Sequence, residues 1–335
     1  MGSTLGVIGL GRIGAFHTDT LAQLPGVDGL VVTDERPDVT ATVAAKFGAR
    51  AVEDAAAVFA SGVDGVVIAA ATPAHAPLIL AAVDAGIPVF CEKPVAFTAD
   101  ESYQVVERLK TSTVPVQIGY NRRFDPAFVA ARNAVVRGEL GWLHTVRSTT
   151  LDPAPPPAEY VAASGGIFRD CSVHDFDIVR WVVGQEVTEV YAAGSNQGDS
   201  VFADCGDVDT ATTTLTFENG TLGVVSNTRY NPRGYDCRLE VHGSQDSVVA
   251  GWDASAPVRN LEPGVTFPDG PPHRFFMDRF TAAYRAELGA FLEVIAGTAP
   301  SPCTAADALE VAWIAEAATL SLSHHRPVQM SEVRR

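Results

Sequence analysis

The sequence predicts an α/β protein of two domains, a doubly wound dinucleotide-binding domain followed by an α+β domain. The chain has 335 residues, and at about 150 residues per domain this length suggests roughly two domains. Over the first 120 residues short apolar runs alternate with helical stretches, which is typical of βαβ units. Beyond that point several strand-like segments follow one another without helices between them, which indicates a mostly antiparallel sheet.

The first domain is expected over residues 1–122. Its apolar runs do not alternate strictly with polar residues, as expected of parallel strands that are buried on both faces. The expected strands are Leu5–Ile8, Leu30–Thr33, Asp64–Ala69, Pro88–Cys91 and Val114–Ile118. The expected helices are Ile13–Leu24, Val39–Phe47, Ala74–Ala85 and Ala99–Lys110.

The second domain is expected over residues 123–335. Here apolar and polar residues alternate within the strand-like segments, and Asn219-Gly220 is a turn signal between two of them. The expected strands are Thr145–Thr150, Thr188–Gly194, Ala211–Phe217, Gly220–Asn227 and Cys237–His242. The expected helices are Pro126–Arg137, Cys171–Val183, Phe276–Ile295 and Ala305–Ser323.

Composition excludes several classes of protein. Aspartate and glutamate (40) outnumber lysine and arginine (24), and a formal charge of −16 argues against nucleic-acid binding. No apolar run approaches the length of about 18 residues that a transmembrane helix needs, and the N-terminus lacks the basic region of a signal peptide. The five cysteines are scattered without a C-x-x-C pair, so we expect no disulfide scaffold, no structural zinc and a reducing, cytoplasmic location.

The clearest motif is a glycine loop. Gly9, Gly11 and Gly14 match G-x-G-x-x-G directly after a strand and at the start of a helix. In such loops the first glycine permits the tight turn, the second lets a pyrophosphate approach, and the third lets helix and strand pack closely. We therefore expect these glycines, with Arg12 and Ile13 at the helix start, to bind a dinucleotide.

Asp34 lies 20 residues after Gly14, at the end of the second expected strand. A carboxylate at that position binds the adenosine ribose hydroxyls and repels a 2′-phosphate, so we expect NAD rather than NADP. Arg12 and Arg36 are nearby cations that would soften this preference if they contacted the cofactor. Each is equally well explained as a solvated surface arginine.

Glu92-Lys93-Pro94 stands at the carboxyl end of an expected strand, where doubly wound folds place their ligands. A surface lysine is the default interpretation of Lys93, but the proline after it restricts its backbone and so aims its side chain. Lys93 is therefore a candidate for chemistry.

Four segments together resemble the Gfo/Idh/MocA oxidoreductases, and within them the inositol dehydrogenases. They are Gly6–Leu21, Glu92-Lys93-Pro94, Tyr120–Pro126 and Gly165–Gly184. The resemblance implies a Rossmann domain followed by an α+β domain with an open sheet through which a homo-oligomer forms, a tetramer or a dimer. It also implies that Lys93, Asp170 and His174 are catalytic, that Glu92 and Lys93 contact the cofactor, and that the Lys93–Pro94 peptide bond is cis.

The residue types agree with that chemistry. Oxidation of a secondary alcohol needs a base for the hydroxyl proton, and a histidine is suited to that task. A lysine ammonium beside the substrate oxygen would stabilise the developing alkoxide. Asp170 and His174 are four residues apart and would share one face of a helix; Asp170 would either hold the imidazole or accept a neighbouring hydroxyl.

Each of these residues also has a plainer explanation. Asp170 is suitable as a helix N-cap, and His174 as a histidine of the core. Asp170, His174 and Asp177 have a helical spacing compatible with a metal site, but hydride transfer from an activated alcohol does not require a metal, so none is expected.

The remaining candidates come from the resemblance. Those expected near the substrate are Lys93, Asn121, Arg122, Asp152, Asp170, His174, Tyr235 and Tyr284; those expected near the nicotinamide are Thr72, Pro73 and His75. The alternatives are a surface pair of Arg122 with Asp125, core packing of Tyr284, an exposed turn at Tyr235 and a plain strand-to-helix connection at Thr72–His75. Leu151 stands where many relatives carry a polar residue, which affects the substrate rather than the reaction class.

Together these observations predict NAD-dependent oxidation of a ring secondary alcohol, with myo-inositol converted to 2-keto-inositol (scyllo-inosose) as the first expectation. A dehydrogenase of another sugar or amino-sugar is the alternative within the same class. A non-catalytic NAD(P)-dependent sensor on the same fold is the alternative from another class, and the intact Lys93, Asp170 and His174 argue against it.

Overall fold

A computed structural model describes residues 2–335 and divides the chain into two compact units. Unit 1 comprises the residues up to Asn121 together with Ala282–Glu310, and unit 2 comprises Arg122–Thr281 together with Val311–Arg335. The division after Asn121 lies one residue from the expected boundary. The expectation that residues 123–335 form one domain is wrong for Ala282–Glu310, because Leu288 and Phe291 in this segment are buried in the core of unit 1.

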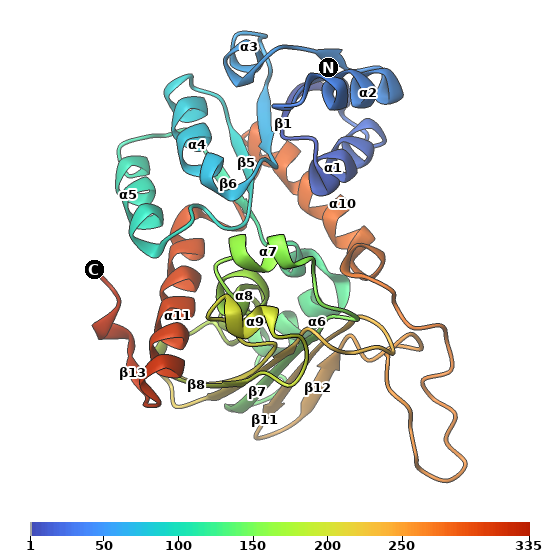
Figure 1. Cartoon of the computed structure of the whole chain (residues 1–335), viewed down its shortest axis with the longest axis vertical. Coiled ribbons are helices and arrows are strands. Elements are labelled where there is room, and N and C mark those ends of the chain that lie inside the picture. Colours follow the sequence, from blue (N-terminus) through green and yellow to red (C-terminus); the bar gives the residue numbers. More distant parts are fainter. Residues whose placement is uncertain (1) are drawn as a thin grey trace. The chain divides into compact units, whose positions relative to one another are not determined.

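Unit 1 is built on a parallel sheet of six strands in the order β3-β2-β1-β4-β5-β6, the order of a Rossmann fold. Helices α1, α2, α4 and α5 lie around its strands in Figure 1. The strands are β1 (Ser3–Ile8), β2 (Val27–Thr33), β3 (Arg50–Ala51), β4 (Gly65–Ile68), β5 (Val89–Glu92) and β6 (Val116–Gly119). All four residues of β4 are buried, as the lack of strict alternation predicts for a parallel strand covered on both faces.

The helices of unit 1 connect the strands of its sheet. They are α1 (Arg12–Ala22), α2 (Pro37–Phe47), α3 (Ala55–Phe59), α4 (His75–Asp84) and α5 (Ala99–Leu109), with the 3-10 turn η1 (Thr72–Ala74). A second 3-10 turn, η2 (Asn121–Phe124), begins at Asn121 and continues into unit 2. Helix α2 starts with Pro37 and ends at Gly48 in the left-handed conformation (φ 65°). Helix α5 has a capping box between Thr98 and Glu101.

Unit 2 contains a seven-stranded mixed sheet in the order β12-β11-β7-β10-β9-β8-β13. The strands are β7 (Leu143–Leu151), β8 (Val187–Ser195), β9 (Thr210–Phe217), β10 (Leu222–Thr228), β11 (Asp236–Gly243), β12 (Ser247–Ala250) and β13 (Val328–Gln329). Hairpin β9–β10 turns at Asn219-Gly220, as expected, with Gly220 at φ 84°. The expectation of a mostly antiparallel sheet is correct, but β7 and β10 pair in parallel, a crossover that strand periodicity does not encode.

Helix α8 packs on one face of this sheet, against β7 and β10. The helices of unit 2 are α6 (Pro126–Val136), α7 (Ala158–Ala163), α8 (Val173–Val183), α9 (Val201–Asp204) and most of α11 (Ala305–His324), with the π-helical turn η3 (Phe168–Ser172) and the 3-10 turn η4 (Met330–Glu332). Side chains of β9 alternate between buried and exposed, so the face of the sheet opposite α8 is open.

The short elements β3, α3, α7, α9, β12 and β13 were not expected, because two to six residues carry too little periodicity.

Helix α10 (Phe276–Ile295) occupies the expected residues but is not a continuous helix. The backbone at Phe280 is non-helical, with φ −113° and ψ 17°. The division between the units follows directly, after Thr281. The kink therefore separates a part of α10 that belongs to unit 2 from a part that belongs to unit 1.

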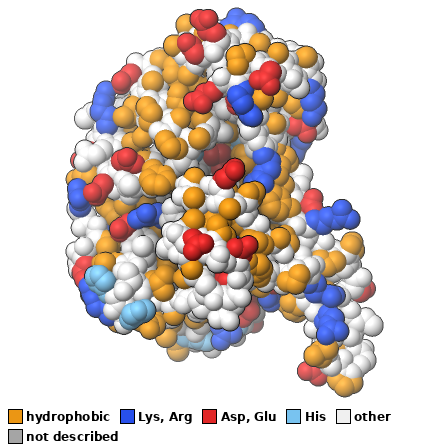
Figure 2. All heavy atoms as spheres, in the orientation of Figure 1, with side chains coloured by type: hydrophobic (Ala, Val, Ile, Leu, Met, Phe, Trp, Pro, Cys, Tyr) orange, Lys and Arg blue, Asp and Glu red, His pale blue; other side chains and the backbone are white. Residues whose placement is uncertain are grey.

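No helix within residues 2–335 is long and apolar enough to cross a membrane. On the face drawn in Figure 2, acidic and basic side chains are interspersed, and lysine and arginine do not form a continuous basic stripe. This distribution gives no support for a nucleic-acid interface on that face.

Candidate active site

The glycine loop joins β1 to α1, and its three glycines meet different constraints. Gly9 has φ +87°, and a Cβ there would lie 2.5 Å from backbone atoms of Ala70. A Cβ on Gly14 would lie 1.9 Å from the carbonyl oxygen of Gly9. A Cβ on Gly11 would have nothing within 4 Å, so the space beside the N-terminus of α1 is open where a pyrophosphate must approach.

That helix terminus has donors for an anion. Gly11 is the N-cap of α1 and provides no side-chain cap, while Arg12 and Ile13 form the first positions of the helix. The first amide groups of a helix lack partners within the helix and carry the positive end of its dipole. The loop therefore fits a dinucleotide both in shape and in its donor set.

Asp34 follows β2 and lies against the glycine loop. Its Oδ2 accepts a hydrogen bond of 2.7 Å from the Leu10 amide, and its Oδ1 accepts one of 3.0 Å from the Arg36 amide. Burial raises the pKa of this carboxyl, but the hydrogen bonds from Leu10 and Arg36 outweigh burial and lower it below the ordinary value. Asp34 is therefore an ionised acceptor, as ribose binding requires, and the Arg36 side chain contacts Asp34 itself.

Glu92 and His75 hold the segment around Lys93 to neighbouring parts of unit 1. Glu92 Oε1 lies 2.6 Å from Nε2 of the fully buried His17 on α1. His75 is buried at the start of α4, with Nδ1 2.6 Å from the Pro94 carbonyl oxygen and Nε2 3.0 Å from that of Ala70. The expected cis bond is present between Lys93 and Pro94. The cofactor contacts of Glu92, His75, Thr72 and Pro73 stay predictions, with Thr72 and Pro73 in turn η1.

Two expected substrate residues, Asn121 and Tyr284, belong to unit 1. Asn121 is buried at 3% exposure in turn η2. The Tyr284 ring packs edge-on against Phe16 (ring centroids 5.3 Å apart) and against His17 (5.7 Å). Core packing thus accounts for the ring of Tyr284, and contact with substrate stays a prediction for both residues.

In unit 2, the motif around His174 is anchored by two buried ion pairs. Arg122 Nη1 donates to Asp175 Oδ1 at 2.8 Å, and Arg123 Nη2 donates to Asp177 Oδ1 at 2.6 Å. Asp175 accepts further hydrogen bonds from Ser148, Thr150 and Asn227. The expected alternative of a surface pair between Arg122 and Asp125 is wrong: Arg122 is 2% exposed, and Asp125 instead pairs with Arg279. Substrate contact by Arg122 stays a prediction.

Asp170 lies inside the π-helical turn η3. It is therefore not a helix N-cap, and that explanation of the residue is wrong. Its Oδ1 accepts a hydrogen bond of 2.8 Å from the Tyr160 hydroxyl, and its Oδ2 accepts one of 2.7 Å from Arg229 Nη2. Asp170 thus accepts a neighbouring hydroxyl, one of the two roles left open for it. π-helical turns are found often at functional sites.

Arg229 also donates through Nη1 to Asp152 Oδ2 at 2.7 Å. Sequence reasoning missed both Arg229 and Tyr160. Arg229 follows strand β10 and Tyr160 lies on the short helix α7 after a proline-rich stretch, and neither position belongs to a motif. The only indication in the sequence was that Asp152 and Asp170, if buried, would each need a cation as partner.

His174 is in the first turn of α8 and is partly buried. Its Nδ1 is a buried atom. The alternative of an exposed turn at Tyr235 is wrong, because the residue is 4% exposed and packs against Phe276 and Phe280. Its contact with substrate stays a prediction. Burial raises the pKa of its hydroxyl well above the ordinary value, so Tyr235 is a neutral hydrogen-bonding group.

The metal alternative required Asp170, His174 and Asp177 to point to one centre. The Asp177 carboxylate is instead held by Arg123 through both Nε and Nη2. Within residues 2–335 no group of three or more metal-ligating side chains is arranged to hold an ion.

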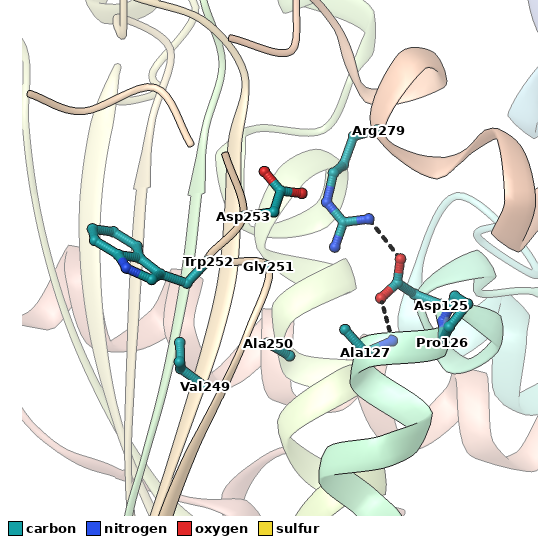
Figure 3. Close-up of a pocket in the computed structure, with 9 residues that line it drawn as sticks. All are labelled: Asp125, Pro126, Ala127, Val249, Ala250, Gly251, Trp252, Asp253 and Arg279. Atoms are coloured by element: carbon teal, nitrogen blue, oxygen red, sulfur yellow. Dashed lines mark hydrogen bonds and ion pairs between the residues drawn. The ribbon is translucent and has the colours of Figure 1, made fainter. Parts of the chain in front are cut away.

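A hollow of about 330 Å³ lies elsewhere in unit 2 (Figure 3). Its lining residues include Asp125 and Pro126 at the start of α6, Gly251 and Trp252 beyond β12, and Arg279 on α10. The close-up shows the Arg279 guanidinium turned toward the Asp125 carboxylate, at 2.6 Å. None of the expected site residues lines this hollow.

Comparisons with known proteins agree with these features. Residues 4–120 match the model of an oxidoreductase family with an NAD-binding Rossmann fold, and residues 128–249 match the GFO/IDH/MocA C-terminal domain. The chain is 36% identical to a myo-inositol 2-dehydrogenase of Thermotoga maritima, covering 98% of this chain and 99% of that protein. It is 35% identical to a scyllo-inositol 2-dehydrogenase (NAD(+)) of Bacillus subtilis, covering 97% and 95%.

A similar solved structure is that of scyllo-inositol dehydrogenase from Lactobacillus casei with bound NAD(H) and scyllo-inositol. It is 26% identical, has a TM-score of 0.90 and covers 99% of this chain and 100% of that chain. The likeness thus extends over both units and over the whole length of these proteins.

Proposed function

Because the chain belongs to the Gfo/Idh/MocA oxidoreductases and its first unit is an NAD-binding Rossmann domain, we propose that it oxidises a ring hydroxyl of a cyclitol. The first candidate is the C2 hydroxyl of myo-inositol, with 2-keto-inositol (scyllo-inosose) as product. The observation that carries this proposal is the full-length similarity to proteins named for that reaction.

The proposed roles follow from the residue chemistry. Bound NAD supplies the acceptor for the hydride that leaves the alcohol carbon. His174 takes the hydroxyl proton at Nε2, since Nδ1 is buried. The Lys93 ammonium stabilises the negative charge that develops on the substrate oxygen. Asp170 remains an anion that fixes Tyr160 and Arg229 around the site.

Substrate recognition needs acceptors and donors for several hydroxyl groups. Asp152 uses Oδ2 to bind Arg229, and we assign its Oδ1 to a substrate hydroxyl. Tyr235 is a buried neutral hydroxyl that both donates and accepts. Leu151 precedes Asp152, at a position where many relatives carry a polar residue. This difference is a reason to test other cyclitols and sugars as well.

The test is a panel of myo-inositol, scyllo-inositol, other cyclitols, pyranoses and amino-sugars with NAD, followed by NADH absorbance. We expect the highest kcat/KM for an inositol stereoisomer. A clearly higher kcat/KM for a pyranose or an amino-sugar would mean that this sugar, and not a cyclitol, is the substrate. Absence of turnover with any member, while NAD still binds, would favour a sensor.

We further propose a homo-oligomer, a tetramer or a dimer, formed through the open face of the unit 2 sheet. Exposed apolar side chains support this, including Tyr191 on β8, Leu222 on β10 and Val249 on β12, which are 42–50% exposed. Sedimentation that finds a monomer at micromolar concentration would contradict the proposal. We place the enzyme in the cytoplasm because four of its five free cysteines are buried thiols that no disulfide uses.

A further inference from the structure

Arg229 joins two acidic residues that lie far apart in the sequence. Strands β7 and β10 pair in parallel with Leu151 opposite Thr228, so the residues after their carboxyl ends, Asp152 and Arg229, become neighbours. The Asp152 amide donates to the Thr228 carbonyl oxygen at 2.9 Å, which continues the ladder past the last strand residues. Asp170 reaches the same guanidinium from turn η3.

The guanidinium is held on both sides. Its side chain is 6% exposed, and the side chains of Asp152 and Asp170 are 17% and 11% exposed. Each carboxylate receives one terminal nitrogen at 2.7 Å. The planar arrangement of the Arg229 donors therefore sets the relative orientation of the two carboxylates.

The charges in this cluster depend on Arg229. Two partly buried carboxylates repel each other, and one guanidinium between them leaves a net charge of −1. Burial raises the pKa of the Asp152 carboxyl; Arg229 opposes this rise, the charge of Asp170 adds to it, and Arg122 opposes it more weakly than Arg229. Loss of the cation would therefore favour protonation of one carboxyl, and a protonated carboxyl offers a hydroxyl ligand a different hydrogen-bonding pattern.

We propose that Arg229 is a positioning residue that keeps Asp152 and Asp170 ionised and aligned, so that Asp152 Oδ1 accepts a hydrogen bond from a substrate hydroxyl. The inference rests on the proposed cyclitol dehydrogenase function. It also defines the ligand: Asp152 selects a polyol that presents a second hydroxyl beside the one oxidised, and a deoxy analogue at that position leaves the carboxylate without its partner.

The experiment compares two variants of Arg229 with a matched control. Arg229→Met keeps much of the side-chain volume and removes the charge, whereas Arg229→Lys keeps the charge and loses the planar pair of donors. Arg180→Met is the control, because Arg180 on α8 makes a similar partly buried bidentate pair, with Glu186 at 2.7 and 2.6 Å. The measurements are kcat and KM between pH 5 and 10, the Kd of NAD, and the melting temperature.

For Arg229→Met we expect kcat/KM to fall about tenfold to a hundredfold, the range for a lost hydrogen bond to a charged group, with an NAD Kd within twofold of wild type. The acidic limb of the pH profile should move to higher pH, because a carboxyl without its cation takes up a proton more readily. Arg229→Lys should restore the position of this limb while KM stays raised. Arg180→Met should change the melting temperature alone.

A folded Arg229→Met protein with the wild-type KM and pH limb would overturn the proposal. Changes of the same kind in Arg180→Met would overturn it as well, since they would reflect general loss of stability. NMR titration of selectively ¹³C-labelled aspartate carboxyls, assigned with Asp152→Asn and Asp170→Asn, needs no substrate. If wild-type enzyme oxidises nothing in the panel, the proposed function fails, and unchanged titration in Arg229→Met would then separately refute the positioning role.

Discussion

The glycine loop of unit 1 and the ion-paired centre of unit 2 reach a defined geometry by opposite means. In the loop, Gly9 and Gly14 are required because a Cβ would collide with backbone atoms, at 2.5 and 1.9 Å. In the centre, side chains define the geometry: Arg122 holds Asp175, and Arg229 holds Asp152 and Asp170. The loop requires residues without a Cβ atom, and the centre requires that each buried charge has a partner of opposite charge.

This difference determines what each region tolerates. The geometry of a backbone cradle exposes helix amides to an anion and does not depend on a network of buried charges. A network of buried charges is destabilised when any one member is removed, because the remaining partner stays in the interior with its charge uncompensated. We therefore expect substitutions in unit 2 to separate into those that end chemistry and those that end stability, and substitutions in the loop to depend on which glycine is changed.

The largest expected effect is on chemistry, at His174 of unit 2 and at Lys93 of unit 1. His174→Ala should reduce turnover by roughly 10²–10⁴-fold, the range of a positioned proton acceptor, and Lys93→Ala should be at least as damaging. For His174→Ala the Kd of NAD and the melting temperature should change little, because the imidazole is assigned to the substrate rather than to the cofactor. Turnover per folded active site, measured beside a melting curve, tests this. Full activity in well-folded His174→Ala protein would refute the assigned mechanism.

The second effect is on stability in unit 2. Asp175→Leu should lower the free energy of unfolding by about 3–5 kcal/mol, because it leaves the buried Arg122 guanidinium without its carboxylate. Asp84→Asn is the control, since Asp84 pairs with Arg108 at the surface with side chains 60% and 51% exposed, and should cost at most about 0.5 kcal/mol. Denaturant unfolding distinguishes the two, and equal midpoints would show that the buried pair adds nothing special.

The third effect separates the glycines. Gly14→Ala should destabilise the protein by about 1–3 kcal/mol, as overpacking does, because the new Cβ would meet the Gly9 carbonyl at 1.9 Å. Gly11→Ala should leave the melting temperature unchanged, since nothing lies within 4 Å, yet weaken NAD binding about tenfold by filling the space of the pyrophosphate. Calorimetry of NAD binding with a melting curve checks both. Wild-type affinity in Gly11→Ala would mean that the cofactor does not approach there.

The smallest effect concerns cofactor choice. Wild-type protein should bind NAD at least about tenfold more tightly than NADP, and Asp34→Ser should narrow this ratio. The pKa of Asp34 in the folded protein is lowered below its ordinary value. The carboxylate is therefore fully ionised at any pH above the ordinary pKa, and it takes up a proton only when the pH falls toward the lowered pKa. The Kd of NAD, which has no 2′-phosphate, should therefore stay constant from pH 8 to pH 5. A ratio near one in wild-type protein, or an NAD affinity that declines over this pH range, would contradict the role of Asp34.

Much of unit 1 was predictable because its signals are local. Gly9, Gly11 and Gly14 specify a turn and a close approach, and Asp34 stands at a spacing set by one βαβ unit. Helix α10 matches its expected residues, although periodicity alone did not reveal the kink at Phe280. The return of Ala282–Glu310 to unit 1 was not predictable, because an apolar helix face does not specify which sheet it covers.

The sequence by itself determined the Rossmann architecture, the dinucleotide loop and the residue types available for alcohol oxidation, since these follow from backbone sterics and short periodicities. The tertiary structure alone decided that Arg229 lies between Asp152, 77 residues earlier, and Asp170, 59 residues earlier. It also decided that Arg122 pairs with Asp175 rather than with Asp125. Pairings over such distances depend on the parallel register of β7 and β10 and on which charges burial brings together, and no local pattern along the chain carries that information.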